Sequence, residues 1–334
     1  MTKKDLRIVF MGTPDFAVET LRALVENDYN VVAVVTQPDK PVGRHGSVLQ
    51  APAVKQYALT VGLPVLQPER MKDAAFVEHL RSYQANLQVV VAFRMLPEVV
   101  WAMPAYGTFN VHAALLPQYR GAAPINWAII NGETQTGVTT FFLDHDIDTG
   151  RIIEQRTFDI PDTADAGYVY DGLMHLGAGI ALSTIEKIMA ADGHPQTTGQ
   201  DEHASPREQP TGSQPPTLHP APKLFKESCQ IDWAQPAKRV YDFVRGLSPY
   251  PGAWTTLTGG GGKESVLKVY ATTKTDSDAG GRRPGTIVAD RKHLLIACAD
   301  RLLQIDALQM AGKKRMEAQA FLNGMKDVEN YSAR

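Results

Sequence analysis

Short apolar runs alternate with segments of helical periodicity in the first part of the chain. The run at 6–11 ends at Gly12, and apolar positions at helical spacing follow in 15–27 before the next buried run at 31–36. This order predicts a βαβ unit. The same alternation predicts helices at 52–60 and near 73–82 and strands at 64–67 and 87–93. The continuous apolar run at 87–93 is typical of a strand covered on both faces, as in a parallel α/β sheet.

The middle of the chain adds a strand, a helix and a strand pair. The strand TFNVHAA at 108–114 precedes a helix that begins near Pro124, a residue favoured in the first turn. Two strands then flank the acidic turn DHDIDTG at 144–150, and such a tight connection predicts antiparallel neighbours at the edge of a mostly parallel sheet. A long helix is predicted at 164–191.

The last third of the chain has a different pattern. Residues 192–222 are polar and rich in Pro, Gly, Ser and Gln, which predicts a linker. A helix at 237–247 is followed by several short strands with Gly-rich turns, which indicate a small closed β-barrel. We therefore predict an α/β domain at 1–191, a linker at 192–222 and a barrel domain at 223–334.

Composition agrees with a folded, two-domain protein. A chain of 334 residues exceeds the size at which one core keeps growing, and 43% hydrophobic with 21% charged residues is ordinary for a globular protein. Cys229 and Cys298 are far apart and have no His or Cys at metal-ligand spacing, so neither a zinc site nor a disulfide framework is expected. No signal peptide or membrane span is predicted, and a cytoplasmic monomer is the expectation.

Charge is distributed unevenly along the sequence. Residues 223–334 contain 18 Lys and Arg against 12 Asp and Glu, whereas residues 1–191 contain 15 against 20. The last segment is thus net positive by six charges and the first net negative by five. This asymmetry favours a polyanionic partner for the C-terminal domain.

Candidate chemistry gathers between residues 107 and 151. Asn110 and His112 stand two apart in a strand, so their side chains should leave the same face. Both can donate to the oxyanion of a tetrahedral intermediate, while Asp148 in the following turn could hold the imidazole protonated and relay a proton. Formyl or acyl transfer to an amine needs no Ser or Cys nucleophile. A structural His and a simple Asx turn remain open as the alternative.

Two loops near the N-terminus bear on the choice of ligand. The turn Gly12-Thr13-Pro14-Asp15 lacks the later glycines of the dinucleotide fingerprint, which argues against an NAD or FAD oxidoreductase. The loop at 36–51 is long, polar and basic. It is either a solvated loop or a mobile clamp on a nucleic-acid end through Lys40 and Arg44.

An ordered set of motifs resembles the 10-formyltetrahydrofolate-dependent formyltransferase family over almost the whole chain, excluding the linker. The motifs are FMGTPDFAV, TQPDKPVGR, NVHAALLPQYRGAAPINWAIING, DIDTG, KLFKESCQIDW, LSPYPGAW and GKKRM followed by FLNG. The resemblance implies a Rossmann-like formyltransferase fold followed by an oligonucleotide-binding (OB)-like barrel. It also implies 10-formyltetrahydrofolate as formyl donor and no metal.

The resemblance assigns roles to individual residues. Asn110, His112 and Asp148 match the family's catalytic Asn, His and Asp. The implied folate-binding residues are Phe93, Arg94, Met95, Leu96, Ala114, Leu115, Leu116 and Pro117. Ala114 stands where the family usually has Ser, and Arg94 lies where many members have Gly. Ala114 thus lacks the hydroxyl of the usual Ser, and Arg94 adds a positive charge.

The implied acceptor is the α-amine of methionyl initiator tRNA, held by Lys40, Arg44 and the basic C-terminal domain. Two alternatives stay open. The acceptor could be a small amine, such as a ribonucleotide or an amino sugar nucleotide, or the chain could be an RNA-binding protein without enzymatic activity.

Overall fold

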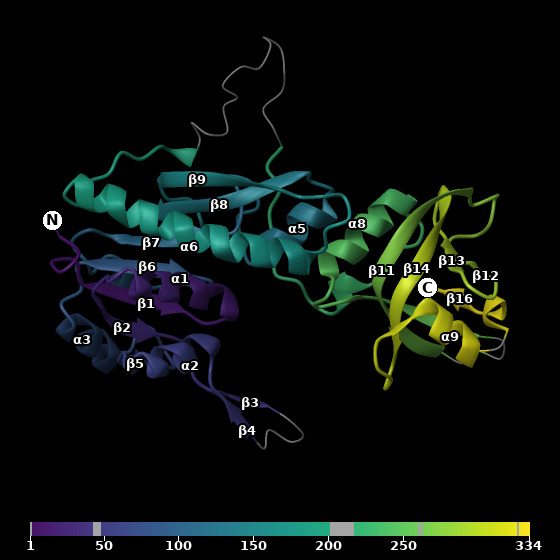
Figure 1. The fold of residues 1–334 in the computed structure, drawn as a ribbon, viewed down its shortest axis with the longest axis horizontal. Coiled ribbons are helices and arrows are strands. Elements are labelled where there is room, and N and C mark those ends of the chain that lie inside the picture. Colours follow the sequence, from purple (N-terminus) through teal and green to yellow (C-terminus); the bar gives the residue numbers. More distant parts are fainter. Residues whose placement is uncertain (1, 43–47, 201–216, 260–261, 263, 326) are drawn as a thin grey trace, which may run out of the picture. The chain divides into compact units, whose positions relative to one another are not determined.

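A seven-stranded sheet organises the N-terminal part of the chain, in the spatial order β5-β2-β1-β6-β7-β8-β9 (Figure 1). The structure is a computed structural model that describes residues 2–42, 48–200, 217–259, 262, 264–325 and 327–334. Strands β5, β2, β1, β6 and β7 pair in parallel, and β8 pairs antiparallel with β7. The predicted mostly parallel sheet is confirmed. Its strands are β1 (Ile8–Gly12), β2 (Val31–Val35), β5 (Val65–Leu66), β6 (Leu87–Val91), β7 (Thr108–His112), β8 (Gln135–Phe142) and β9 (Ile152–Asp159).

Helices cover this sheet with apolar faces. The helices are α1 (Asp15–Glu26), α2 (Ala53–Thr60), α3 (Ala74–Ser82), α4 (Glu98–Trp101) and α6 (Ala166–Ala190). A further helix, α5 (Pro124–Ile130), follows β7 in the sequence. Every residue of β6 is buried, including the polar Gln88, as its mostly apolar sequence predicts. A Cβ at Gly177 of α6 would lie 3.4 Å from a methyl group of Val111, so α6 packs closely against β7, the strand that carries His112.

Short elements escaped prediction. The loop at 36–51 contains a hairpin formed by β3 (Lys40–Val42) and β4 (Val48–Gln50), which pair antiparallel. The one-turn helix α4 is the next element after β6 and was not predicted. Each of these elements has only three or four residues, too few for a hydrophobic period to appear.

The C-terminal part forms a second, antiparallel sheet in the order β12-β13-β14-β11-β10-β16. Its ends approach each other, since Thr286 bridges Ser332 and the Ala333 amide donates to the Gly285 carbonyl at 2.8 Å. The predicted barrel is confirmed as a nearly closed one. Its elements are α8 (Ala237–Leu247), β10 (Ala253–Thr258), β11 (Glu264–Asp278), β12 (Ile287–Ala289), β13 (Leu294–Ala297), β14 (Arg301–Met310), β15 (Met316–Glu317), α9 (Ala318–Gly324) and β16 (Ser332–Ala333).

Backbone contacts divide the chain into two compact units. The first comprises 1–121, 136–158 and 170–220, and the second comprises 122–135, 159–169 and 221–334. Two segments from the middle of the sequence therefore belong to the unit that contains the barrel. In that unit the Asn126 amide donates to the Gly246 carbonyl, and the Tyr241 hydroxyl donates to the Asp162 carbonyl. The sequence boundaries 1–191, 192–222 and 223–334 stay a prediction about domains.

No helix within the described ranges has the length and apolar character needed to cross a membrane.

Candidate active site

Strand β7 supplies the first two candidate residues. Asn110 is half-buried and pairs with Phe141 of β8, while His112 is buried and pairs with Thr139. Residues two apart in a strand share a face, so both side chains leave β7 in one direction. No partner for the Asn110 amide is found in the part of the chain that the structure describes. An amide group of this kind is free to bind a ligand.

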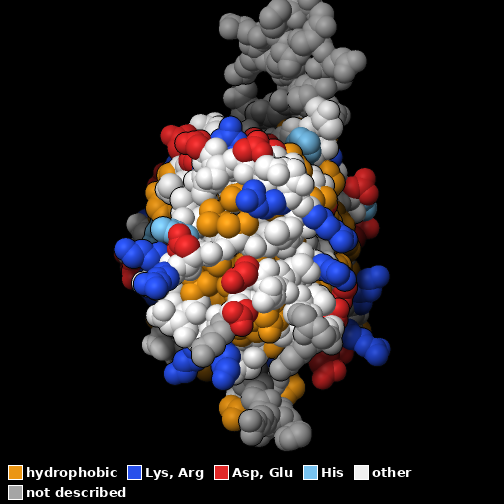
Figure 2. Space-filling view, turned by 90° about the vertical axis from the view of Figure 1, so that its right-hand side faces the viewer, with side chains coloured by type: hydrophobic (Ala, Val, Ile, Leu, Met, Phe, Trp, Pro, Cys, Tyr) orange, Lys and Arg blue, Asp and Glu red, His pale blue; other side chains and the backbone are white. Residues whose placement is uncertain are grey.

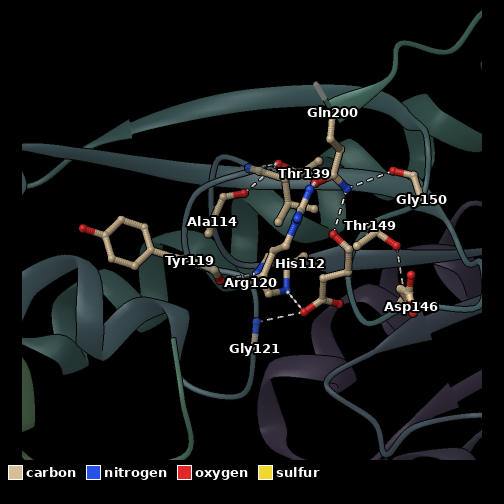
Figure 3. Close-up of polar contacts among 12 residues, drawn as sticks. His112, Ala114, Tyr119, Arg120, Gly121, Thr139, Asp146, Thr149, Gly150 and Gln200 are labelled. Atoms are coloured by element: carbon tan, nitrogen blue, oxygen red, sulfur yellow. Dashed lines mark hydrogen bonds and ion pairs between the residues drawn. The ribbon is translucent and has the colours of Figure 1, made fainter. Parts of the chain in front are cut away.

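The His112 ring has a different partner on each nitrogen (Figure 3). Nε2 lies 2.9 Å from the Tyr119 carbonyl oxygen, which can only accept, so Nε2 carries a proton and donates. Nδ1 lies 3.8 Å from Oδ2 of Asp148. With Nε2 already protonated, Nδ1 can donate only in the doubly protonated, cationic ring. The sequence prediction that His112 and Asp148 lie together agrees with this geometry.

The Asp148 carboxylate is held by the turn that follows β8. Its Oδ2 accepts from the Gly121 amide at 3.0 Å, and its side chain is 13% exposed. Asp148 itself has φ of 55°, in the left-handed region that residues with a Cβ seldom adopt. Local strain of this kind clusters at functional sites, where neighbouring groups hold it in place.

The segment 114–117 is fixed from its inner side. The Thr139 hydroxyl donates to the Ala114 carbonyl at 2.6 Å and accepts from the Leu116 amide at 3.1 Å, and the Gln155 amide donates to the Leu116 carbonyl at 2.8 Å. Ala114, Leu116 and Pro117 are buried, whereas Leu115 is half-buried. The backbone of Ala114 and Leu116 is thus engaged within the protein, and Leu115 is the member of this segment with accessible surface.

The segment 93–97 leaves the carboxyl end of β6. Met95 is 72% exposed, whereas Leu96 is 8% exposed and packs in the core beside β1 and β2. The Arg94 guanidinium donates to the carbonyls of Glu69, at 2.9 Å, and Pro68. Burial lowers the pKa of Arg94 from its usual value. Its charge therefore fastens the neighbouring loop and is not free for a ligand.

The structure describes only one of the two predicted nucleic-acid contacts. Lys40 is exposed at the start of the short β3–β4 hairpin. Arg44 lies outside the described residues. Among the residues that the structure does describe, no cluster of three or more His, Cys, Asp and Glu could hold a metal ion.

Three residues that sequence reasoning missed complete the surroundings of His112 and Asp148. Tyr119 and Gly121 contribute only backbone atoms, so no side-chain chemistry marks them. Gln200 lies in the segment predicted as a linker, yet it is 4% exposed and hydrogen-bonded to the Asp148 turn. The resemblance to NVHAALLPQYRG covered the first two but assigned them no role, and it did not extend to Gln200.

Comparison with known proteins identifies two matched regions. Residues 6–185 match the family described as formyl transferase, and residues 223–326 match the formyl transferase C-terminal domain. The methionyl-tRNA formyltransferase of Parabacteroides distasonis is 57% identical over 333 residues, covering 99% of both chains. That of Bacteroides fragilis is 53% identical over 332 residues, covering 99% of this chain and 98% of the relative.

Solved structures share the fold at low sequence identity. HypX from Aquifex aeolicus in complex with tetrahydrofolic acid superposes with a TM-score of 0.60 at 20% identity, covering 96% of this chain and 48% of that longer one. The sugar 3N-formyl transferase WlaRD superposes with a TM-score of 0.57 at 16% identity, covering 92% of this chain and 99% of that one. The family match extends over more than half of the sequence, and full-length relatives exceed 50% identity. The chain belongs to the formyl transferase family.

Proposed function

We propose that this protein transfers the formyl group of 10-formyltetrahydrofolate to the α-amine of methionyl initiator tRNA, the reaction that supplies formylated initiator for translation. The observation that carries the chemistry is the buried His112 facing the Asp148 carboxylate, beside the free amide of Asn110. The choice of acceptor rests on the full-length relatives, which carry the name methionyl-tRNA formyltransferase and match both domains.

The surface next to the pair suits a reduced folate. Phe93 and the exposed Met95 offer apolar area at the carboxyl end of β6, where open α/β sheets bind ligands. Leu115 offers its side chain from the loop that follows β7. We assign the folate-binding role to the segments 93–96 and 114–117 together. Arg94 and Leu116 would contribute indirectly, because their hydrogen bonds fix the position of the neighbouring backbone.

The proposed mechanism uses the three side chains in distinct roles. The neutral amine attacks the formyl carbon, the bond from that carbon to the folate nitrogen breaks, and the proton lost by the amine passes to the folate nitrogen. The Asn110 amide and the Nδ1–H of protonated His112 donate to the oxygen on which negative charge develops. Asp148 balances the imidazolium charge and relays the amine proton through a water to the folate nitrogen.

The tRNA side of the proposal rests on charge. Residues 223–334 are net positive, and the face in Figure 2 has Lys and Arg side chains spread between acidic and apolar groups. Lys40 on the hairpin, and Arg44 from the sequence, are proposed contacts near the acceptor end. A cytoplasmic location and a monomeric state remain predictions.

Formylation of charged initiator tRNA by purified protein tests the chemistry. We expect His112→Ala and Asp148→Ala each to lower kcat by at least about a hundredfold, the usual effect of removing a positioned acid, base or oxyanion donor. The matched control is His79→Ala, which removes an exposed histidine that stacks on Tyr83. Unchanged kcat in both site variants would refute the site, whereas no formylation by the wild-type protein would favour a binding protein without catalysis.

A panel of acceptors tests the substrate. Methionyl initiator tRNA, free methionine, an aminoribonucleotide and an amino sugar nucleotide are compared at one concentration of formyl donor. We expect turnover with the charged tRNA to exceed turnover with the other three. Preference for one of the small amines would replace the proposed acceptor while leaving the His112 and Asp148 chemistry intact.

A further inference from the structure

Gln200 makes four hydrogen bonds with its single side-chain amide (Figure 3). Its Nε2 donates to the carbonyl of Asp148 at 2.8 Å and to the carbonyl of Gly150 at 2.9 Å. Its Oε1 accepts from Nε and Nη2 of Arg120, at 2.9 Å and 2.6 Å. Because carbonyls only accept and a guanidinium only donates, this orientation of the amide is fixed.

These contacts join the two loops that surround His112. One is the 148–150 turn, which carries the Asp148 carboxylate. The other contains Arg120, preceded by Tyr119, whose carbonyl accepts from His112, and followed by Gly121, whose amide donates to Asp148. Displacement of either loop would change the distance between the Asp148 carboxylate and the imidazole.

The turn needs external support because its backbone is strained. Asp148 has φ of 55°, and a Cβ at Gly150 would overlap the carbonyl oxygen of Phe142, so the chain passes there at the closest possible approach. Both amide hydrogens of Gln200 are used on the carbonyls of this turn. A strained backbone persists only where its surroundings hold it.

The residues immediately before Gln200 hold it in place. Thr198 exchanges two backbone hydrogen bonds with Ile152, each of 2.9 Å. The segment therefore runs beside the start of β9 and delivers Gln200 to the turn. Among natural side chains of this length, only glutamine can donate to two carbonyls and accept from arginine at once.

We propose that Gln200 is a positioning residue for formyl transfer, which holds the Asp148 carboxylate at the His112 ring by clamping the 148–150 turn to the loop of Arg120. The expected effect on kcat rests on the proposed function. The expected effect on the position of the Asp148 carboxylate rests on the hydrogen bonds alone.

Three variants separate this role from general stability. Gln200→Ala removes all four hydrogen bonds. Gln200→Glu keeps the size and the partner of Arg120 but places a carboxylate against the carbonyls of Asp148 and Gly150. Thr197→Val is the matched control, because it removes one side-chain hydrogen bond in the same segment, the one from Arg151, and leaves the Thr198–Ile152 backbone pair that anchors Gln200 intact.

The kinetic readout is the separation of kcat from KM. We expect Gln200→Ala and Gln200→Glu to lower kcat in initiator tRNA formylation by about ten- to a hundredfold, the scale of a small displacement of a catalytic group. KM for the folate and for the tRNA should stay within about twofold, because no substrate contact is removed. Thr197→Val should retain wild-type values. Wild-type kcat in folded Gln200→Ala, or an equal loss in Thr197→Val, would overturn the proposal.

A second readout needs no substrate. The Gly121 amide donates to Asp148 and is protected from solvent exchange only while the carboxylate stays in place. Its hydrogen exchange, followed by NMR, should accelerate at least about tenfold in Gln200→Glu and remain unchanged in Thr197→Val. If wild type fails to formylate tRNA but Gly121 exchange responds as expected, the function is wrong and the positioning role stands. Unchanged Gly121 exchange would refute the positioning role whatever the activity.

Discussion

Backbone groups fix both partners of the His112 ring. Tyr119, with φ of 59°, presents its carbonyl to Nε2, and Asp148, with φ of 55°, presents its carboxylate to Nδ1. The left-handed conformation costs roughly 1 kcal/mol or more for each residue with a Cβ. Hydrogen bonds from the Tyr119 amide to the His219 carbonyl and from Gln200 to the Asp148 carbonyl offset part of this cost. The imidazole orientation is therefore set by two strained residues that the neighbouring segment stabilises.

The sequence predicts only part of this arrangement. Asn110 and His112 could be placed on one face because strand periodicity is local, and Asp148 could be named because a short turn follows the next strand. Gln200 could not be found in this way, since 52 residues separate it from Asp148 and its polar surroundings are typical of a linker. Long-range hydrogen bonds of backbone carbonyls leave no periodic pattern in a sequence.

Arg94 provides a residue-scale prediction. Its guanidinium binds the carbonyls of Pro68 and Glu69, and it lies near Met71 Sδ at 3.2 Å. We expect Arg94→Lys to lower the free energy of unfolding by about 1–2 kcal/mol, because an ammonium group cannot span both carbonyls. Urea unfolding measures this change. KM for the folate should rise only slightly, because Arg94 acts on it through the position of the 68–71 loop. A large rise in this KM without loss of stability would indicate direct binding by Arg94.

At the scale of elements, the longest predicted segments are those that the structure reproduces. The apolar run of β6 and the helical period of α6 each contain enough positions to identify their type, and α6 spans 166–190 where 164–191 was predicted. The hairpin at 40–50 and helix α4 are too short to do so. The tight turn predicted that the strands on either side of it, β8 and β9, are neighbours, as they are in the sheet, but it did not predict that β8 runs antiparallel to β7.

Glu154 links β9 to α6 and gives an element-scale prediction. Burial by itself would raise the pKa of this carboxyl, but hydrogen bonds from Lys187, Ser183 and Arg156 outweigh burial and lower it. A lowered pKa in the folded state gives stability that is present above the unfolded value of about 4.3 and is lost as the pH falls through the folded pKa.

Glu154→Gln should therefore lower the free energy of unfolding by about 2 kcal/mol at pH 7. The difference from wild type should shrink as the pH falls below about 4. Denaturant titrations of both proteins across this range provide the measurement. A difference that stays constant with pH would show that the carboxylate charge contributes nothing and that only its hydrogen-bond geometry matters.

At the scale of the whole molecule, the two cysteines report on the barrel unit. Both are buried in the core of that unit, and burial, with a smaller effect of Asp300, raises the pKa of Cys298 to about 12. Burial also raises the pKa of Cys229. Since the thiolate is the reactive form, neither thiol should react with Ellman's reagent at pH 8 in the native protein.

Unfolding in urea should release both thiols, so the rate of labelling measures opening of the barrel. The neutral thiol is favoured in the folded state, which contributes stability below the unfolded pKa of about 8.5 and loses it as the pH rises toward 12. Rapid labelling of one thiol under native conditions would indicate local opening of the strand or turn that holds it.

The charge distribution gives a second prediction at this scale. If the basic C-terminal part binds tRNA phosphates, KM for initiator tRNA should rise about tenfold or more between 50 and 200 mM KCl, the expected range for several phosphate contacts. KM for the folate should change much less, because fewer charges are involved. Lys40→Ala should reduce the slope of this salt dependence, whereas Lys72→Ala, another exposed lysine, should not. A tRNA KM that does not depend on salt would contradict binding through phosphates.

The position of Gln200 has a consequence for dividing or recombining proteins of this kind. The family match of the catalytic region ends at residue 185, and the composition of the chain suggests a cut at 191, yet the clamp on the Asp148 turn comes from residue 200. A chimaera joined at 191 would exchange that glutamine together with the foreign C-terminal half, and its turnover would depend on which residue the donor brings. A junction beyond residue 222 keeps the clamp with its own turn, and an exchanged barrel would then need to fit the retained segments 122–135 and 159–169.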